Sequence, residues 1–183
     1  MTNTALLSLT SLSALFLLLS FSAKAQKRTI TITSKVLVKT TVEEAFELLR
    51  QFDRFPEWSP FLVADPDQKY HVTGDNGAIG SAFHWQGVGE KSEGYQTLSV
   101  LEENQYLRMD CNISLPFKST PTFEYRLRRT PEGVEIIQEF SMQPSAFSYL
   151  MMRIFKVEAE MQATNQLGLE RLKTLLEGVP KAA

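Results

Sequence analysis

Alternation of apolar and polar side chains predicts strands along much of the chain. In residues 28–39, isoleucines and valines alternate with polar residues, which is the period-two pattern of a strand with one buried face. Similar segments recur between Lys69 and Gln143, and the breaks between them hold residues that suit turns. The strands predicted there span residues 69–73, 80–86, 93–102, 105–114, 121–129 and 134–142. Their close spacing favours antiparallel pairing.

A short helix is predicted after the first strand. Thr41 and Glu44 have the spacing of a capping box, in which each side chain accepts a hydrogen bond from the backbone N–H of the other residue. The apolar positions that follow fall on one helical stripe. The helix should end before Pro56, because a residue that precedes proline is pushed out of the helical region. Residues 57–61 are then expected to be irregular.

A long C-terminal helix is predicted by apolar residues that recur at steps of three and four. Gly178 ends this pattern, as glycine commonly does at a helix C-terminus. An unbroken helix over residues 145–177 would be roughly 50 Å long at about 1.5 Å per residue, which is more than a small domain needs. We therefore expect a break between Ser145 and Val157.

The N-terminal segment differs in composition from the rest of the chain. Residues 5–23 contain no charge and no proline, and Ala23-Lys24-Ala25 then fits a small-x-small site for signal peptidase. This pattern predicts that residues 1–25 form a cleaved signal peptide. The domain over residues 26–183 would then be exported to a periplasmic or extracellular location.

An uncleaved membrane anchor is the alternative. Basic residues follow the apolar segment rather than precede it, which is the reverse of the usual charge bias. About 20 apolar residues span a bilayer, so residues 5–23 are long enough to associate with a membrane. A third interpretation, a buried helix of the fold, also stays open. In each case we leave residues 1–25 out of the predicted domain.

Composition and charge narrow the classes of function. With 183 residues, of which 43% are hydrophobic and 22% charged, the chain has the profile of one globular domain with a packed core. The 19 basic and 21 acidic residues give a net charge of -2. Such a chain has no overall basic field to hold a phosphate backbone, so nucleic acid is not an expected partner.

Motifs for metals, cofactors and nucleophiles are not found in the sequence. Cys111 is the single cysteine, which excludes a disulfide within the chain. His71 and His84 fall on different predicted strands without the spacing of metal ligands, so no metal site is expected. The sequence also lacks a glycine loop for a nucleotide and a G-x-S-x-G motif, and no cofactor is expected.

Four segments, together with the order of the predicted elements, resemble a known family. They are Glu43-Glu44-Ala45-Phe46, residues 52–61 (FDRFPEWSPF), residues 80–85 (GSAFHW) and residues 168–173 (GLERLK). Over roughly residues 29–177, the chain resembles the polyketide cyclase/dehydrase and lipid-transport group of the SRPBCC, or START-like, superfamily.

This resemblance implies an α+β helix-grip fold. In that fold, a curved antiparallel sheet, here of about seven strands, wraps around a long C-terminal helix, with one or two short helices after the first strand. The superfamily includes lipid carriers, cyclases, hydrolases and chaperone cofactors. The fold therefore leaves the function open.

The implied ligand site is the space between the sheet and the long helix. Such sites are concave and mostly apolar, with few polar groups. Most residues expected to line it are aromatic residues and methionines. They are Phe83, Trp85, Phe123, Tyr125, Phe140, Phe147, Met151, Ile154 and Met161, with Trp58 and Phe61 at the lip. The alternative is that these side chains only fill the core, as such residues commonly do.

A few polar residues are further candidates for this site. Glu158 and Asn165 interrupt the apolar stripe of the long helix, where either could orient a polar ligand group. Burial would raise the pKa of Glu158 and let it exchange a proton, whereas a small drift in helix phase would turn it to water. Tyr95 is another candidate. His84 lies between two expected lining residues, and strand geometry should turn it to the opposite face.

Three classes of function fit these observations. Binding, and transport, of a hydrophobic small molecule or lipid needs only the cavity, and we favour it. A polyketide cyclase/dehydrase-like enzyme acting on a hydrophobic substrate there would need a converging acid-base pair. The sequence supplies no such pair, so we name no catalytic residue. A protein-interaction domain would need an exposed apolar patch, and the pattern shows none.

Overall fold

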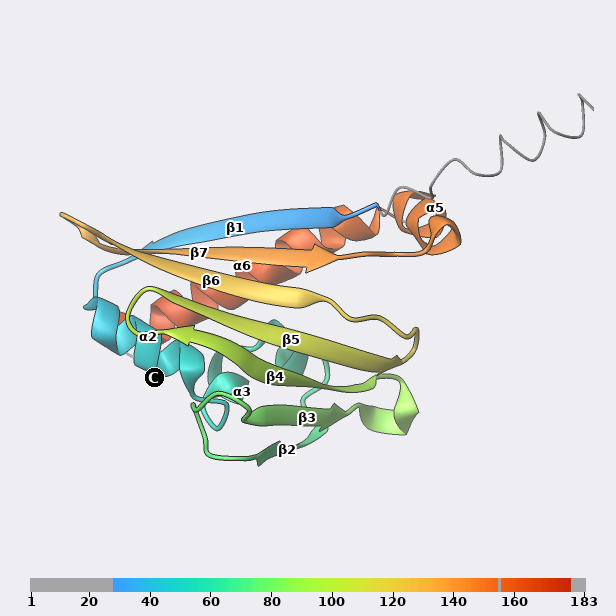
Figure 1. The fold of residues 1–183 in the computed structure, drawn as a ribbon, viewed down its shortest axis with the longest axis horizontal. Helices are drawn as coiled ribbons and strands as arrows, with labels where there is room; N and C mark the ends of the chain where they lie inside the picture. The colour runs from blue at the N-terminus through green and yellow to red at the C-terminus, as the bar shows by residue number, and fades with distance from the viewer. Residues whose placement is uncertain (1–27, 155, 179–183) are drawn as a thin grey trace, which may run out of the picture.

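A curved antiparallel sheet forms one layer of the protein (Figure 1). The computed structural model describes residues 28–154 and 156–178. The strands in this part are β1 (Ile30–Val38), β2 (Lys69–Thr73), β3 (Ala82–Gln86), β4 (Glu93–Glu102), β5 (Tyr106–Leu115), β6 (Thr122–Thr130) and β7 (Gly133–Met142). Their order in the sheet is β1-β7-β6-β5-β4-β3-β2. Each strand from β2 to β6 therefore pairs with the next one along the chain, and β1 closes the far edge against β7.

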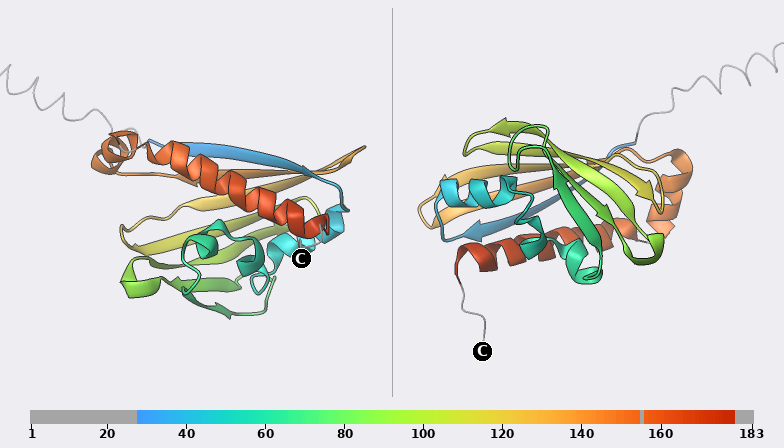
Figure 2. Two further views of the ribbon diagram at one scale, coloured as in Figure 1. Left: turned by 180° about the vertical axis from the view of Figure 1, so that it is seen from behind. Right: turned by 90° about the horizontal axis from the view of Figure 1, so that it is seen from below.

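Helices form the second layer, on one face of the sheet (Figure 2). They are α2 (Val42–Arg50), α3 (Phe55–Trp58), α4 (Pro60–Ala64), α5 (Ala146–Ile154) and α6 (Val157–Leu176), and a short 3-10 turn, η1 (Val88–Glu90), joins β3 to β4. Helix α6 packs against β1, and α3 and α4 pack against α6. This arrangement is the predicted α+β helix-grip fold, with the long C-terminal helix held by the sheet.

The alternation along β1 places its apolar side chains in the core. Its isoleucines and inward valines are buried, and the residues between them are exposed. Ser34 shares the inner face and is also buried. Its Oγ atom accepts a hydrogen bond of 2.9 Å from Nε2 of Gln162 on α6. This polar contact helps to hold α6 against the first strand, since a buried hydroxyl needs a partner.

Helix α2 begins at the predicted capping box. The backbone N–H of Glu44 donates to Oγ1 of Thr41 at 3.2 Å, and the backbone N–H of Thr41 donates to Oε2 of Glu44 at 3.3 Å. The apolar stripe of the helix is buried in the core. The local sequence thus sets both the start of α2 and the face that it buries.

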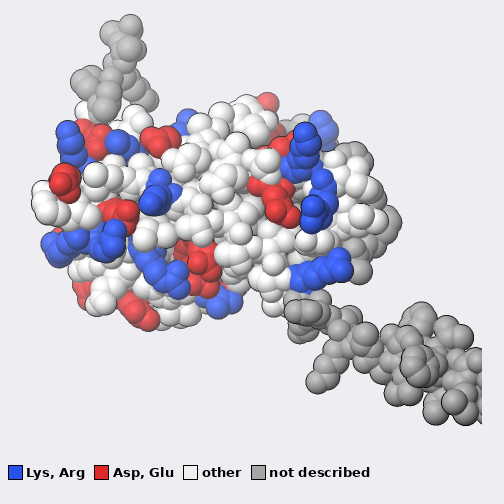
Figure 3. Space-filling view, turned by 90° about the horizontal axis from the view of Figure 1, so that it is seen from above, with Lys and Arg blue, Asp and Glu red and all other residues white. Residues whose placement is uncertain are grey.

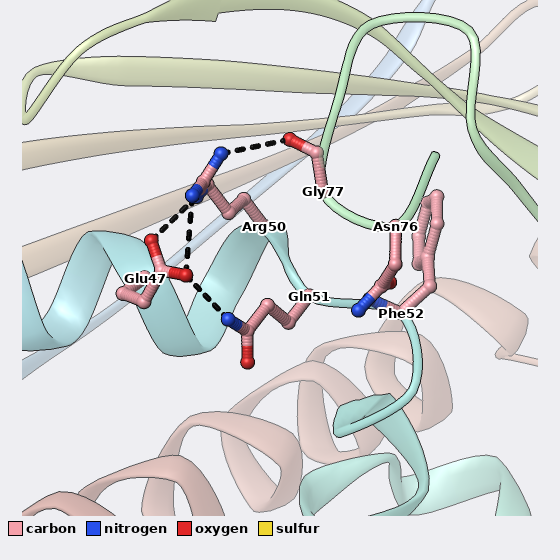
Figure 4. A network of polar contacts seen from close by, with 6 residues as sticks. All are labelled: Glu47, Arg50, Gln51, Phe52, Asn76 and Gly77. Atoms are coloured by element: carbon pink, nitrogen blue, oxygen red, sulfur yellow. Dashed lines mark hydrogen bonds and ion pairs between the residues drawn. The ribbon is translucent and has the colours of Figure 1, made fainter. Parts of the chain in front are cut away.

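The end of α2 is fastened to the loop between β2 and β3 (Figure 4). Oδ1 of Asn76 in this loop accepts a hydrogen bond of 2.8 Å from the backbone N–H of Phe52. Nη1 of Arg50 donates to the carbonyl of Gly77 at 3.2 Å, and its guanidinium also pairs with Glu47. Because the Phe52 side chain is fully buried, these contacts define the path of the chain into α3.

Residues 57–61, expected to be irregular, instead belong largely to two short helices. Pro56 and Pro60 lie in the first turns of α3 and α4. A proline is tolerated there, because the N–H that it lacks has no partner within a helix. Each proline therefore begins a helix in this segment. The bounds of the strands, by contrast, agree closely with the prediction.

The C-terminal helix is broken within the predicted interval. Helix α5 ends at Ile154, and α6 begins at Val157. Lys156, just before α6, has a left-handed backbone conformation with φ 55°. A right-handed helix cannot continue through such a residue. The chain changes direction here without a proline, which is why the sequence predicted the interval but not the position.

The predicted signal peptide or anchor, residues 1–25, lies outside the described residues. Among the described residues, no helix combines the length and the apolar character that crossing a membrane requires. The described part also covers nearly all of the predicted domain over residues 26–183.

Charged side chains of both signs are intermixed on the face shown in Figure 3. Arg128 and Glu135 form one ion pair and Arg129 and Glu43 another, each with a nitrogen-oxygen distance of 2.5 Å. Exposed pairs of this kind contribute about 0–1 kcal/mol each to stability. The buried core must therefore supply most of the stability of the fold.

Candidate functional site

A small cavity lies between the inner face of the sheet and α6. Its volume is about 20 Å³, which is room for about one water molecule. Residues from both layers line it, and most of them are apolar. They are Phe55, Trp58, Pro60, Phe61, Gln96, Phe123, Tyr125, Gln138, Asn165, Gly168 and Leu169. The cavity is thus where the fold implied a ligand site, but side chains nearly fill it.

Aromatic rings form much of the cavity wall. Phe55 and Trp58 of α3 meet edge to face, with their ring centroids 4.8 Å apart. Phe123 and Tyr125 point inward because they occupy alternate positions on β6, and Tyr125 lies 6.3 Å from Trp58, also edge to face. Phe61 of α4 is 41% exposed. It therefore marks the rim where the cavity meets solvent.

Gly168 lets α4 come close to α6. A Cβ atom at this position would lie 3.1 Å from Cδ of Pro60, closer than such atoms normally pack. Glycine within a helix costs about 1 kcal/mol relative to alanine, and the close contact with Pro60 explains its presence in α6. Pro60 is the one buried residue of α4. The rest of this helix lies at the surface or only partly covered.

Four buried polar side chains, which we call the polar cluster, line the cavity: Trp58, Gln96, Gln138 and Asn165. Trp58 and Asn165 are 2% exposed, and the two glutamines 5%. Among the described residues, Trp58 Nε1, Gln96 Nε2, Asn165 Nδ2 and Gln138 Oε1 have no hydrogen-bond partner. Each such atom costs about 1–3 kcal/mol of stability. The side chains that make up the polar cluster thus hold three unpaired donors and one unpaired acceptor at the cavity wall.

Tyr125 and Cys111 contact the polar cluster. Nε2 of Gln138 donates to the hydroxyl of Tyr125 at 3.1 Å, and the Cys111 thiol donates to Oε1 of Gln96 at 3.7 Å. Burial raises the pKa of Tyr125 well above its ordinary value and that of Cys111 to about 12. Both groups therefore stay protonated and neutral. Tyr125 is the only titratable residue among the described residues that line the cavity.

Nine of the predicted site residues line the cavity or pack in or against the hydrophobic core. Those that line the cavity are Trp58, Phe61, Phe123, Tyr125 and Asn165. Those that pack in or against the surrounding core are Phe83, Trp85, Phe140 and Met161. The Phe83 ring lies 5.0 Å from Phe55, and the Phe140 ring 5.1 Å from Phe123. Phe83 and Phe140 thus support rings of the cavity wall rather than forming the wall themselves.

Three predicted site residues do not line the cavity. Tyr95 is 40% exposed on the outer face of β4, because its neighbour Gln96 takes the inward position. Glu158 is exposed in the first turn of α6, and Ile154 is 58% exposed in α5. The break at Lys156 separates the helical stripe into two parts. The stripe therefore does not continue inward through Ile154 and Glu158.

Three further residues singled out in the sequence are Phe147, Met151 and His84. The side chains of Phe147 and Met151 lie outside the described part of the structure. His84 faces away from the cavity, as strand geometry predicts, and its ring stacks on His71 with centroids 4.6 Å apart. Burial, together with the neighbouring His71, lowers the pKa of His84.

Sequence reasoning missed Gln96 and Gln138. Gln138 lies between the buried residues Ile136 and Phe140 at steps of two along β7, and Gln96 lies two residues before the buried Leu98 on β4. A glutamine at an inward position of an alternating strand was therefore the available signal.

The chain matches a family profile and is similar in fold to several solved structures. The profile described as polyketide cyclase / dehydrase and lipid transport matches residues 29–177. The di-domain ARO/CYC StfQ from the steffimycin biosynthetic pathway shares 12% identity at a TM-score of 0.66, over 97% of this chain and 62% of that one.

Two single-domain structures are similar over nearly their whole length. The major latex-like protein 151 of Panax ginseng shares 12% identity at a TM-score of 0.54, over 83% of this chain and 99% of that one. Protein MLL2253 from Mesorhizobium loti shares 17% identity at a TM-score of 0.62, over 82% and 99%. No match was found among the curated proteins. Identities this low show a shared fold and no more.

Proposed function

Since the chain belongs to the polyketide cyclase/dehydrase and lipid transport family, we propose that it binds a hydrophobic small molecule or lipid between its sheet and α6. The observation that carries this proposal is the cavity, whose walls are mainly apolar, with five aromatic residues and a few buried polar groups. Small-molecule sites commonly have this composition. Transport of the bound molecule is the further step that we propose for this domain.

Entry of a ligand would require α4 to move. The space of about 20 Å³ holds about one water molecule, so a larger molecule needs room from its surroundings. Phe61 and Val63 of α4 are 41% and 49% exposed, and Pro60 is the one buried residue of this helix, with Leu62 partly buried against the core. Segments with few buried contacts open at the lowest free-energy cost. An outward shift of α4 would open the cavity at Phe61.

A cyclase-like or dehydrase-like enzyme could use the same cavity. It would need acid and base groups within reach of the substrate. Tyr125 is the only titratable group among the described lining residues, and burial raises its pKa. A tyrosine with a raised pKa is a poor base near neutral pH. Binding therefore has the stronger support.

The proposal can be tested by native mass spectrometry of the full chain, purified from its own host without detergent. We expect a reproducible mass above that of the denatured protein, from a compound that extracts into organic solvent. A clean mass of the protein alone would count against the binding proposal and favour the enzyme or protein-interaction alternatives.

Two leucine variants on α6 provide a matched control. Leu169 lines the cavity and is 1% exposed, whereas Leu167 is 48% exposed. Leu169→Trp should occupy the ligand space and remove most of the extra mass, while Leu167→Trp should retain it. Circular dichroism shows whether both variants are folded. Equal loss of the extra mass in two folded variants would place the ligand elsewhere.

A further inference from the structure

We propose that the polar cluster binds a neutral oxygen group, a carbonyl or a hydroxyl, at the buried end of an otherwise apolar ligand. This inference rests on the proposed function and specifies the chemistry of the ligand. Four polar side chains at one cavity are nearly fully buried. Each of them keeps a hydrogen-bonding atom that has no partner among the described residues. Native proteins rarely leave such atoms unpaired, and each one calls for an explanation.

The polar cluster is assembled from both layers of the fold. Trp58 comes from α3, Gln96 from β4, Gln138 from β7 and Asn165 from α6. No local turn or helix end places these groups together, so they do not serve as caps of secondary structure. Hydrogen-bonding groups that are buried without a partner lower the stability of a protein. A ligand that satisfies them would recover this free energy on binding.

The free atoms specify the kind of group that fits. Trp58, Gln96 and Asn165 each present an N–H donor, and Gln138 presents an oxygen acceptor. A carbonyl oxygen has two lone pairs and can therefore accept from two of the donors. A hydroxyl group can accept from a donor and also donate to Oε1 of Gln138. A ligand with both groups would match the polar cluster most fully.

The described residues that line the cavity carry no charge, which excludes an ionised ligand group. No lysine, arginine or histidine is among the described residues that line it. A carboxylate would be buried there without a cation, and a charge buried unpaired is very costly. An ammonium group would meet three donors and a single acceptor. The oxygen group is therefore neutral, and the aromatic side chains of Phe55, Phe123 and Tyr125 would contact the apolar remainder of the ligand.

The experiment compares two probes of nearly equal shape, 1-tetralone and tetralin, which differ in one carbonyl oxygen. Binding of each to the full chain is measured by equilibrium dialysis, with competition between them to show that they share a site. We expect the ketone to bind roughly ten- to a hundredfold more tightly, because the hydrocarbon leaves the buried donors unpaired. Equal affinities would overturn the inference and leave the proposed function standing.

Variants assign the preference to the polar cluster. Asn165→Leu and Gln96→Met replace a free donor by an apolar side chain, and each should reduce the preference for the ketone roughly fivefold or more. Both variants should also unfold at a higher temperature than the unmodified protein when no ligand is present, because a buried unpaired group is removed. A side chain with a purely structural role would not show these opposite effects.

Tyr95→Phe is the matched control, since Tyr95 neighbours Gln96 on β4 but lies on the outer face. Tyr95→Phe should change neither the preference for the ketone over the hydrocarbon nor the unfolding temperature appreciably. A ketone preference that persists in both cluster variants would overturn the assignment to these residues. Failure of both probes to bind would overturn the inference together with the proposed function.

Discussion

The buried side chain of Cys111 makes the stability of the fold depend on pH. It lies on β5, is 6% exposed, and has its thiol next to Gln96 of the polar cluster. Burial raises its pKa from an ordinary value of 9.0 to about 12. In the unfolded chain, the thiol would ionise near the ordinary value. The folded protein therefore keeps a proton that the unfolded chain loses over this range of pH.

Because the unfolded state binds fewer protons there, stability should fall as pH rises above about 9. The contribution of Cys111 to this slope is at most about 1.4 kcal/mol per pH unit. In Cys111→Ala, stability should decrease less steeply with rising pH, whatever the effect of the substitution at neutral pH. Urea unfolding between about pH 8 and about pH 11 measures both slopes. Identical slopes would mean that Cys111 does not titrate as its burial implies.

Asn165 and Glu158 show what the sequence could and could not establish about single residues. Both interrupt the same apolar stripe, so the pattern treated them alike. In the structure, Asn165 is 2% exposed and lines the cavity, whereas Glu158 is exposed. The difference comes from the start of α6 at Val157, which places Glu158 in the first turn of the helix.

At the scale of elements, Asn76 joins the end of α2 to the β2–β3 loop, as Figure 4 shows. Its Oδ1 atom accepts hydrogen bonds from the backbone N–H groups of Phe52, at 2.8 Å, and Asp53, at 3.3 Å. Asn76→Ala should lower the free energy of unfolding by about 1–3 kcal/mol, because it leaves the partly buried N–H of Phe52 unpaired. Denaturant unfolding measures this loss.

Asn76→Asp is the conservative counterpart, because a carboxylate oxygen can accept the same two hydrogen bonds. It should retain most of the stability that Asn76→Ala loses. If the two variants are destabilised equally, the side-chain oxygen is not what fastens this loop to α2.

Most elements could be predicted because their causes are local. The period-two alternation of β1 and the capping box of α2 depend on residues that are neighbours in the sequence. Residues 57–61 were expected to be irregular because Pro56 was taken as the end of a helix, although proline also suits the first turn of one, as in α3 and α4. The position of the break at Lys156 could not be predicted, because it carries no sequence signal.

At the scale of the whole molecule, the N-terminal segment bears on where the domain is located. We propose that residues 1–25 direct export and are removed, with an uncleaved anchor through residues 5–23 as the alternative. N-terminal sequencing of the native protein should then begin at Gln26. A sequence that begins at Met1 would instead support the anchor, and fractionation with membranes would be expected to accompany it.

The sequence by itself determined the order and type of the main elements, because alternation, helical stripes and turn residues act over short distances. The helix-grip fold followed from the resemblance of four segments and of this element order to a known family. The sequence also identified five side chains that line the cavity. The tertiary structure alone decided that Gln96, Gln138 and Asn165 meet Trp58 there. They come from four elements far apart in the sequence, and only the packing of α6 and α3 against the sheet brings them together.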